Sequence, residues 1–492
     1  MNTPVLFKPD ALPDHTHLWE NIVIGSGPGG AETAVMLAET GHEVLVLEAG
    51  AYSPRETVPP YTPQEMQSRY AQGGITLAVG RPSVQYVEGC CLGGGSEVNS
   101  GLYYRLPEEL ANAWRSYPVL GDNLPAELEA ASNAIEQDLS VSLLPGEAPR
   151  ASLLLKDGAE TLGWYCPEIP RWQLYDKEHP KGLRQTMTRT YLTRAQKAGA
   201  RVCTNLEVQK LKRGQDYWLV LVKPHTRSEN LGDGTAQDAA QDLTLKAKRV
   251  FVCAGAIRSP ALLKQSGLIS RPAPLWCHPT VKVIAEFKDE VNQGSEVAVH
   301  QVKEFGRAMG MGCSISSPHY LLASLHNLPG GDEAVTERWR HLLCYYVMIA
   351  PEGRGMVRNL PFSGTYPLAT YSVTPRDLSV LSLGLQRLCK LLFSAGALRL
   401  WPTVKGLGPF TAPSDLALIP DALPRRGSAL MSIHLGGTCA APEITDPYGA
   451  VKGCDGLYVQ DASLLPEPLG CNPQGSMLAL VRRNLNHLIP DL

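Results

Sequence analysis

A glycine-rich turn near the start of the chain most limits how it can fold. The apolar run Ile22–Ile24 leads into Gly25, Gly27 and Gly30 at G-x-G-x-x-G spacing, and an apolar helical pattern follows. This order is typical of a strand, tight turn and helix that bind a dinucleotide. Gly25 permits the turn, Gly27 lets backbone amides approach a pyrophosphate, and Gly30 lets the helix pack closely. The positive end of the helix favours the phosphate charge.

A second apolar run supports this interpretation. Val44–Leu47 predicts the next strand, and the acid that ends it, Glu48, can accept a hydrogen bond from a ribose hydroxyl. A plain strand-to-helix turn is the alternative, and the flanking strands and the distance to the acid disfavour it.

The composition is that of a large globular protein. Its 492 residues include 44% hydrophobic and 19% charged side chains, which is enough for two or three domains. The formal net charge of -3 gives no indication of binding to nucleic acid or to an anionic membrane. Met1–Glu20 lacks the apolar core of a signal peptide, so we expect a cytoplasmic protein.

One leucine-rich stretch, Leu378–Leu398, is interrupted by charged residues and a glycine, and it predicts a buried amphipathic helix instead of a transmembrane segment. Thr374 as N-cap and Pro375 at the first helical position predict where this helix starts. The 12 cysteines are scattered without a C-x-x-C pair, so we expect no metal site and mostly buried free thiols. The adjacent Cys90 and Cys91 are interpreted as reduced, with a redox role as the alternative.

The order of elements predicts a discontinuous domain. Residues 15–280 are expected to form its first part, with a polar hairpin near 224–243, a buried strand at Val250–Cys253, and a helix starting at Ser259 and Pro260. Residues 281–430 are expected to form an α+β block over a cavity, and residues 431–492 to return to the first domain. In the middle block we expect a half-buried strand after Pro279 and a strand at Leu342–Ile349, with 355–360 and 366–373 as its neighbours. A terminal helix is predicted from about Gln474 to Leu488.

Three further motifs follow the first. A glycine loop spans Gly89–Gly101, a second segment spans Ala254–Gly267, and the last begins at His434 and continues through Asp461 to Gln474. The loop glycines would let the backbone lie flat against phosphates and a planar ring. A nicotinamide dehydrogenase would explain the first motif and leave these three unused.

The four motifs, in this order, resemble the glucose–methanol–choline (GMC) family of flavoprotein oxidoreductases along nearly the whole chain. The resemblance implies an α/β fold: a discontinuous Rossmann-like FAD-binding domain with an α+β substrate-binding domain over the flavin. It places the start of the terminal helix, at Gln474, at the pyrimidine edge of the flavin, where the positive N-terminal end of the helix would stabilise an anionic reduced ring. The residues that it implies for FAD are Gly25, Gly27, Gly30, Glu48, Ala49, Gly93, Gly94, Gly95, Ser96, Asn99, Val208, Ala254, Gly255, Asp461, Ala462 and Gln474.

His434 and Asn472 match the catalytic pair of that family. The resemblance implies oxidation of an alcohol (CH–OH) to an aldehyde or ketone, with hydride transfer to the flavin N5. A neutral histidine can accept the hydroxyl proton near neutral pH, and an asparagine can hold the oxygen. For these two residues the alternatives are a buried core histidine and a plain helix N-cap. Thr438 and Ser96 are expected to support the backbone, and His278 is expected to be structural.

Two departures from the family pattern affect the cofactor. Cys90 stands where the flavin loop of the family commonly has arginine, and Glu97 stands near the histidine that attaches the flavin covalently in some members. We therefore expect non-covalent FAD. The predicted partners are a small-molecule alcohol, and oxygen or another electron acceptor.

The segment Met309–Ser317 with Tyr345, Tyr346 and Met348 is uncharged, which favours a hydrophobic or aromatic substrate. Alternative functions are a photodecarboxylase or non-redox lyase on the same fold, and a flavin-binding redox-partner subunit without its own turnover.

Overall fold

The computed structural model describes residues 8–11, 13–54, 57–115, 120–121, 123–225, 242–294, 299–326, 328–360 and 366–492. The expected polar hairpin near 224–243 lies largely outside the described residues. The two strands that flank it, β10 (Trp218–Pro224) and β11 (Leu243–Val252), are antiparallel neighbours, as the sequence predicts.

One lobe is built on a seven-stranded sheet in the order β8-β2-β1-β11-β10-β9, with β22 also paired to β11. The strands β1, β2, β8, β11 and β22 are parallel, and the crossover from β1 through helix α1 to β2 is the predicted dinucleotide-binding unit. The bounds are β1 Leu18–Ile24, α1 Pro28–Glu39, β2 Val44–Leu47, β8 Arg201–Cys203, β9 Leu206–Arg213 and β22 Leu457–Val459.

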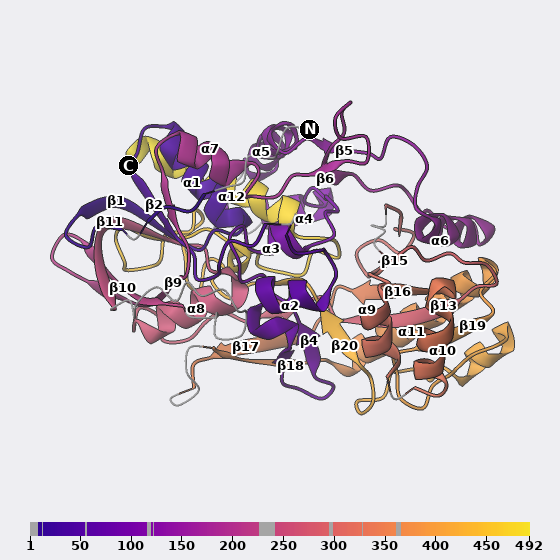
Figure 1. Cartoon of the computed structure of the whole chain (residues 1–492). Coiled ribbons are helices and arrows are strands. Elements are labelled where there is room, and N and C mark those ends of the chain that lie inside the picture. Colours follow the sequence, from indigo (N-terminus) through magenta and orange to yellow (C-terminus); the bar gives the residue numbers. More distant parts are fainter. Residues whose placement is uncertain are drawn as a thin grey trace.

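The end of the chain returns to this lobe. The terminal helix α12 (Gln474–Leu488) packs against α1 and α5, and its bounds match the prediction (Figure 1). The other helices of this lobe are α4 (Glu108–Arg115), α5 (Leu124–Asp138), α7 (Tyr191–Lys197) and α8 (Gly255–Gln265).

Helix α8 begins at Gly255, five residues before the predicted first helical residue Pro260, so Pro260 lies inside it. Proline has no N–H, so the Ala256 carbonyl lacks its usual helical donor. The Thr438 hydroxyl donates to that carbonyl at 2.7 Å and replaces the missing bond. Thr438 thus supports the backbone, in agreement with the prediction.

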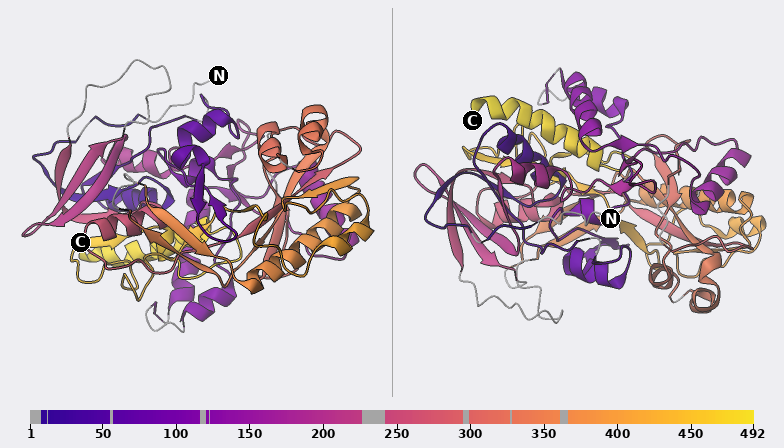
Figure 2. Two further views of the ribbon diagram at one scale, coloured as in Figure 1. Left: turned by 90° about the horizontal axis from the view of Figure 1, so that it is seen from below. Right: turned by 45° about the horizontal axis from the view of Figure 1, so that its top comes forward.

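The second lobe contains an eight-stranded sheet in the order β14-β15-β16-β13-β20-β4-β3, with β19 also paired to β13 (Figure 2). The hairpin of β3 and β4 comes from the first part of the chain, and β4 pairs with β20 in parallel. The bounds are β3 Thr76–Ala78, β4 Val84–Tyr86, β13 Thr280–Glu286, β14 Gln301–Val302, β15 Met309–Cys313, β16 Leu342–Ile349, β19 Arg399–Pro402 and β20 Leu430–Ser432.

Helices cover both faces of this sheet. Helix α11 (Pro375–Ser394) starts with the predicted cap, in which Thr374 and Asp377 form a capping box, and it packs on β13 and β16. Helix α9 (Pro318–Leu325) packs on the opposite face, where Ile284 of β13 joins its leucines. Strand β13 is therefore buried on both faces, and the expectation of a half-buried strand is wrong.

The predicted neighbours of β16 are also wrong. Strands β17 (Arg354–Arg358) and β18 (Leu368–Ser372) pair with each other in a separate ribbon, because β13 and β15 already occupy both edges of β16. The remaining elements are α2 Pro63–Arg69, α3 Gly95–Val98, β5 Val141–Ser142, α6 Arg150–Thr161, β6 Arg171–Leu174, β7 Leu183–Arg184, β12 Trp276–Cys277, α10 Gly331–Arg338 and β21 Leu435–Gly436.

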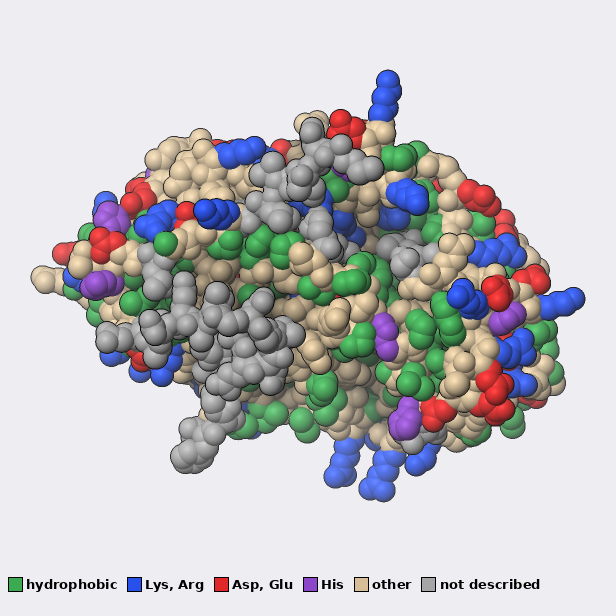
Figure 3. All heavy atoms as spheres, in the orientation of Figure 1, with side chains coloured by type: hydrophobic (Ala, Val, Ile, Leu, Met, Phe, Trp, Pro, Cys, Tyr) green, Lys and Arg blue, Asp and Glu red, His purple; other side chains and the backbone are tan. Residues whose placement is uncertain are grey.

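Charged side chains of both signs share the surface. On the face shown in Figure 3, acidic and basic side chains are interspersed without a large area of one sign. Within the described ranges, no helix has the length and apolar character needed to cross a bilayer, and no group of residues could hold a metal ion. All twelve cysteines are free thiols, and ten of them are buried.

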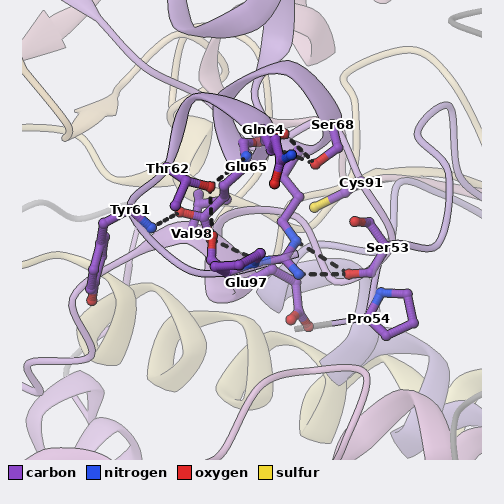
Figure 4. Close-up of polar contacts among 12 residues, drawn as sticks. Ser53, Pro54, Tyr61, Thr62, Gln64, Glu65, Ser68, Cys91, Glu97 and Val98 are labelled. Carbon is purple, nitrogen blue, oxygen red and sulfur yellow. Dashed lines mark hydrogen bonds and ion pairs between the residues drawn. The ribbon is translucent and has the colours of Figure 1, made fainter. Parts of the chain in front are cut away.

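A buried ion pair in α2 holds the backbone at Ser53 and at Tyr61. Arg69 and Glu65 lie one turn apart with a contact of 2.7 Å, and both side chains are at most 1% exposed. Arg69 also donates to the Ser53 carbonyl, and the Tyr61 amide donates to Glu65 (Figure 4).

Replacing Arg69 with methionine should lower the free energy of unfolding by about 3 kcal/mol, because Glu65 would be left buried without its partner. Lys156→Met, which removes the exposed one-turn pair with Glu160, is the matched control and should cost less than about 0.5 kcal/mol. Denaturant unfolding measures both, and equal losses in the two variants would contradict the expectation.

Candidate active site

The turn between β1 and α1 forms the first wall of the site. Gly25 has a φ of +97°, and a Cβ there would lie 2.5 Å from the Cys253 carbonyl oxygen. A Cβ on Gly30 would lie 2.0 Å from the Gly25 carbonyl oxygen, so the helix packs directly on the turn. The N-cap residue Gly27 has no side chain to cap α1, which leaves amides at the helix start for an anion.

A cleft beside this turn brings most of the predicted cofactor residues together. Five of the predicted residues do not line this cleft: Gly30, Gly93, Ser96, Asn99 and Gln474. The predicted residues that line it are Gly25, Gly27, Glu48, Ala49, Gly94, Gly95, Val208, Ala254, Gly255, Asp461 and Ala462.

The glycine loop after β4 forms the second wall. Gly94 has a φ of +53°, and a Cβ there would lie 2.7 Å from the Cα of Gly27, so the two turns meet backbone to backbone. Ser96 donates to the Gly93 carbonyl at 2.8 Å and accepts from the Met187 amide, which makes it a support of the loop. Glu97 is buried and accepts from the Thr188 hydroxyl at 2.7 Å.

Two buried carboxylates hold the loops of the cleft. Glu48 accepts from the amide and hydroxyl of Ser26, at 2.9 and 2.6 Å, and from the Gly50 amide. Asp461 accepts from the Gly255 amide at 2.8 Å and from the Ser259 hydroxyl, and so caps the start of α8. Burial raises the pKa of both acids. A contact of Glu48 with a ribose hydroxyl remains a prediction.

Arg258 is a cleft residue that the sequence reasoning did not select. It lines the cleft on α8 and donates to Glu207 at 2.8 Å. Hydrogen bonds to Cys90 and to Glu207 raise the pKa of His225 to about 9, so this histidine is cationic at neutral pH. Two cations, Arg258 and His225, therefore lie near Cys90, which stands where the family commonly has an arginine. The segment Ala254–Gly267 was recognised as a motif, but a single arginine on a helix has no signature of its own.

Three buried polar atoms without partners gather at the start of α12. They are Oδ1 of Asn99, Oδ1 of Asn472 and Oγ of Ser476, for which the described residues supply no hydrogen bond. The Asn99 amide donates to Gln474 at 2.5 Å, so these two predicted residues bond to each other. The N-cap of α12 is Pro473 and no side chain caps it, so Asn472 is not the plain cap that was its alternative role.

His434 is buried and its ring contacts a second histidine. The Nδ1 atoms of His434 and His278 are 3.0 Å apart, and the Gly470 amide donates to Nε2 of His278 at 3.1 Å. A neutral His278 then carries its proton on Nδ1, and His434 accepts it, which leaves the proton of His434 on Nε2. His278 was expected to be structural, but it fixes the ring at the site and joins the segments of His434 and Asn472.

Both histidines are uncharged at neutral pH. Burial, with a contribution from Lys303, lowers the pKa of His434 to about 3. Burial and the neighbouring His434 lower the pKa of His278 well below its ordinary value.

This depression makes stability depend on pH. Below about pH 6.5 the unfolded chain binds protons at both rings that the folded chain does not, so stability falls with decreasing pH. The double variant His278→Gln, His434→Gln should flatten this slope by about two protons between pH 6 and 4. Unfolding by urea across this range measures the slope, and an unchanged slope in the variant would contradict the assignment.

The cleft fits a flavin dinucleotide. Its glycine walls exclude side chains from the backbone, and the start of α1 faces it. The unpartnered polar atoms near α12 require a polar group that the described residues do not supply. Ile433 and Leu435, the chain neighbours of His434, line the same cleft.

Comparison with known proteins agrees with this geometry. Models of the GMC oxidoreductase family match residues 66–281 and 354–480. An uncharacterized GMC-type oxidoreductase of Sinorhizobium fredii is 34% identical over 477 residues, which cover 94% of this chain and 93% of that protein. A long-chain-alcohol oxidase of Arabidopsis thaliana is 25% identical over 503 residues, covering 92% and 64% of the two chains.

The crystal structure of pyridoxine 4-oxidase from Mesorbium loti has the same fold, with a TM-score of 0.71 at 17% identity and coverage of 96% and 99%. The chain belongs to the GMC oxidoreductase family, as its motifs predict. Membership implies that it binds FAD and acts as an oxidoreductase.

Proposed function

We propose that this protein oxidises an alcohol to an aldehyde or ketone, with His434 and Asn472 as the catalytic pair. The observation that carries the proposal is the buried Oδ1 of Asn472, which has no hydrogen-bond partner among the described residues. His278 contacts the neutral ring of His434 and accepts from the Gly470 amide, so it links this ring to the segment that contains Asn472. A substrate hydroxyl between the two side chains could donate to Oδ1 of Asn472 and accept from the Nε2–H of resting His434, which would satisfy both groups. The alcohol oxidases among the relatives support the same reaction class.

Each chain residue has a defined part in this reaction. Bound FAD would accept the hydride at N5. Asn472 orients the substrate hydroxyl, and His434 receives its proton. Because Nε2 of resting His434 carries a hydrogen, proton uptake at this atom requires His434 to hold its own proton on Nδ1. His278 must then accept a hydrogen bond at Nδ1 and carry its own hydrogen on Nε2, which costs its bond from the Gly470 amide. The pair of rings therefore changes tautomer together.

Non-covalent attachment of FAD is part of the proposal. Glu97 occupies the position near the covalent histidine of some relatives, and its carboxylate is held by Thr188 away from any nucleophilic role. Denaturation with acid should release the yellow cofactor into the supernatant, whereas flavin that stays with the precipitated chain would contradict this assignment.

We also propose a substrate with an apolar body. Side chains alternate between the two faces of β16, so the three β16 residues that suggested an apolar substrate do not all lie on one face. Tyr345 faces α11 and donates to the Ala151 carbonyl, so it belongs to the core. Tyr346 and Met348 lie on the opposite face, and of the three β16 residues these two remain as support.

Anaerobic mixing of the yellow protein with alcohols tests the function. A panel of primary alcohols, secondary alcohols, sterols and sugars should include compounds that bleach the flavin absorbance. Re-admission of air then separates an oxidase, which recovers its colour, from a dehydrogenase that needs another acceptor. Bleaching by dithionite but by no alcohol in the panel would contradict the proposal.

A further inference from the structure

Lys303 is a half-buried cation without a counter-ion. It directly follows β14, and its amide donates to the Tyr165 carbonyl at 2.9 Å. Its Nζ lies 4.1 Å from the ring centroid of Tyr104, and this cation–π contact orients the ammonium. Across the part of the chain that the structure describes, no carboxylate forms an ion pair with it. A buried ammonium in this state is costly, and burial lowers its pKa.

Lys303 lies on the side of the fold where the catalytic pair is found. Its positive charge lowers the pKa of both His434 and His278, and it interacts electrostatically with Cys471, the residue before Asn472. Tyr104, which holds the ammonium, also contacts Gly475 in the first turn of α12, where a Cβ would lie 2.2 Å from the Tyr104 carbonyl oxygen. The ammonium is thus close to the proposed alcohol site, without being part of the proton-handling pair.

Three polar side chains near Lys303 are neutral and satisfy one another. The Tyr104 hydroxyl donates to the Gln301 side chain at 2.7 Å, and Gln301 donates to the Tyr346 hydroxyl at 2.8 Å. The nearby Arg307 is paired with Glu467 at 2.9 Å, so its charge is compensated. Among these described neighbours, Lys303 is therefore the charge that has no partner of opposite sign.

We propose that Lys303 binds an anionic group of the substrate, so that the alcohol oxidised at His434 and Asn472 is a hydroxy acid whose carboxylate pairs with this ammonium. The inference rests on the proposed function and narrows it to an alcohol with an apolar body and an acidic end. Binding of the carboxylate would supply the missing counter-ion and restore the pKa of the lysine.

Matched acids and esters test this proposal. The probes are 4-(hydroxymethyl)benzoate and 6-hydroxyhexanoate, each paired with its methyl ester, and flavin reduction is followed anaerobically by stopped flow. We expect the wild type to prefer at least one acid over its ester by roughly 10-fold or more in reduction rate over dissociation constant, the size of one charge-assisted hydrogen bond. Lys303→Met should abolish the preference, so that the acid and its ester are reduced with equal efficiency, and Lys303→Arg should keep part of it.

The control is Lys390→Met, which removes an exposed lysine of α11 and should leave the preference unchanged. Equal rates for acids and esters in the wild type would overturn the proposal, as would an equal loss for both in Lys303→Met, because the lysine would then serve the reaction and not the acid.

Binding without turnover separates this proposal from the function itself. Calorimetric titration with benzoate and hexanoate, which lack the hydroxyl, should show binding to the wild-type holoenzyme and at least tenfold weaker binding to Lys303→Met. Carboxylate binding that depends on Lys303, in a protein that no alcohol reduces, would support the anion site and contradict the alcohol chemistry. Reduction by neutral alcohols, without carboxylate binding that depends on Lys303, would support the alcohol chemistry and contradict the anion site.

Discussion

Replacing His434 with alanine should leave FAD bound and slow the reduction of the flavin by an alcohol about 1,000-fold, within the range that a positioned proton acceptor contributes. The cofactor should remain because the His434 side chain is not among the cleft residues, and its neighbours Ile433 and Leu435 line the cleft instead. Stopped-flow absorbance under anaerobic conditions measures the reduction, and the absorbance ratio of flavin to protein measures occupancy.

A second substitution separates the two possible roles of the ring. His434→Gln keeps an N–H donor near the substrate but cannot take up a proton at neutral pH. It should therefore be nearly as slow as His434→Ala, and near-normal reduction would show that His434 only donates a hydrogen bond. His179→Ala removes an exposed histidine that is paired with Asp176 and should behave as the wild type.

Gly94→Ala should yield a folded protein without yellow colour. The new Cβ would lie 2.7 Å from the Cα of Gly27, and backbone atoms cannot yield as a flexible side chain does. The φ of +53° with a ψ of -135° is a further cost for any residue but glycine. The two walls of the cleft would be forced apart where the phosphates are expected, so FAD per chain should fall more than tenfold.

Circular dichroism should show that the fold of the Gly94 variant persists, and dialysis with excess FAD measures the residual affinity. Gly199→Ala is the matched control, because Gly199 has a φ of +101° but no atom within 4 Å of its missing Cβ. This variant has the backbone strain without the contact and should keep its cofactor. Normal FAD content in Gly94→Ala would show that the loop adapts and that the contact does not limit binding.

Local patterns predicted the parts of this molecule that depend on neighbours in sequence. The turn from β1 to α1, the capping box of α11 and the bounds of α12 are each fixed by residues within a few positions of the element. The family resemblance added the assembly of distant motifs around one cleft, which no local pattern indicates.

The remainder depends on partners far away in sequence. Helix α8 can begin before its proline because the Thr438 hydroxyl donates to the Ala256 carbonyl, 182 residues earlier in the chain. Strand β13 is buried on both faces by helices that follow it in sequence. The role of His278 depends on its contact with the ring of His434, 156 residues away. Lys303 was missed because a lysine is ordinarily solvated, and only the folded chain reveals that no carboxylate among the described residues pairs with it.

The ladder between β4 and β20 has a consequence for the modularity of the chain. Leu430, Met431 and Ser432 pair with Val84, Gln85 and Tyr86, so the sheet of the second lobe includes a hairpin translated long before it. A fragment spanning 281–430 would lack that hairpin and leave an edge open to aggregation. This lobe is consequently no transplantable module, and exchanging substrate preferences between relatives requires grafting individual side chains rather than the whole block.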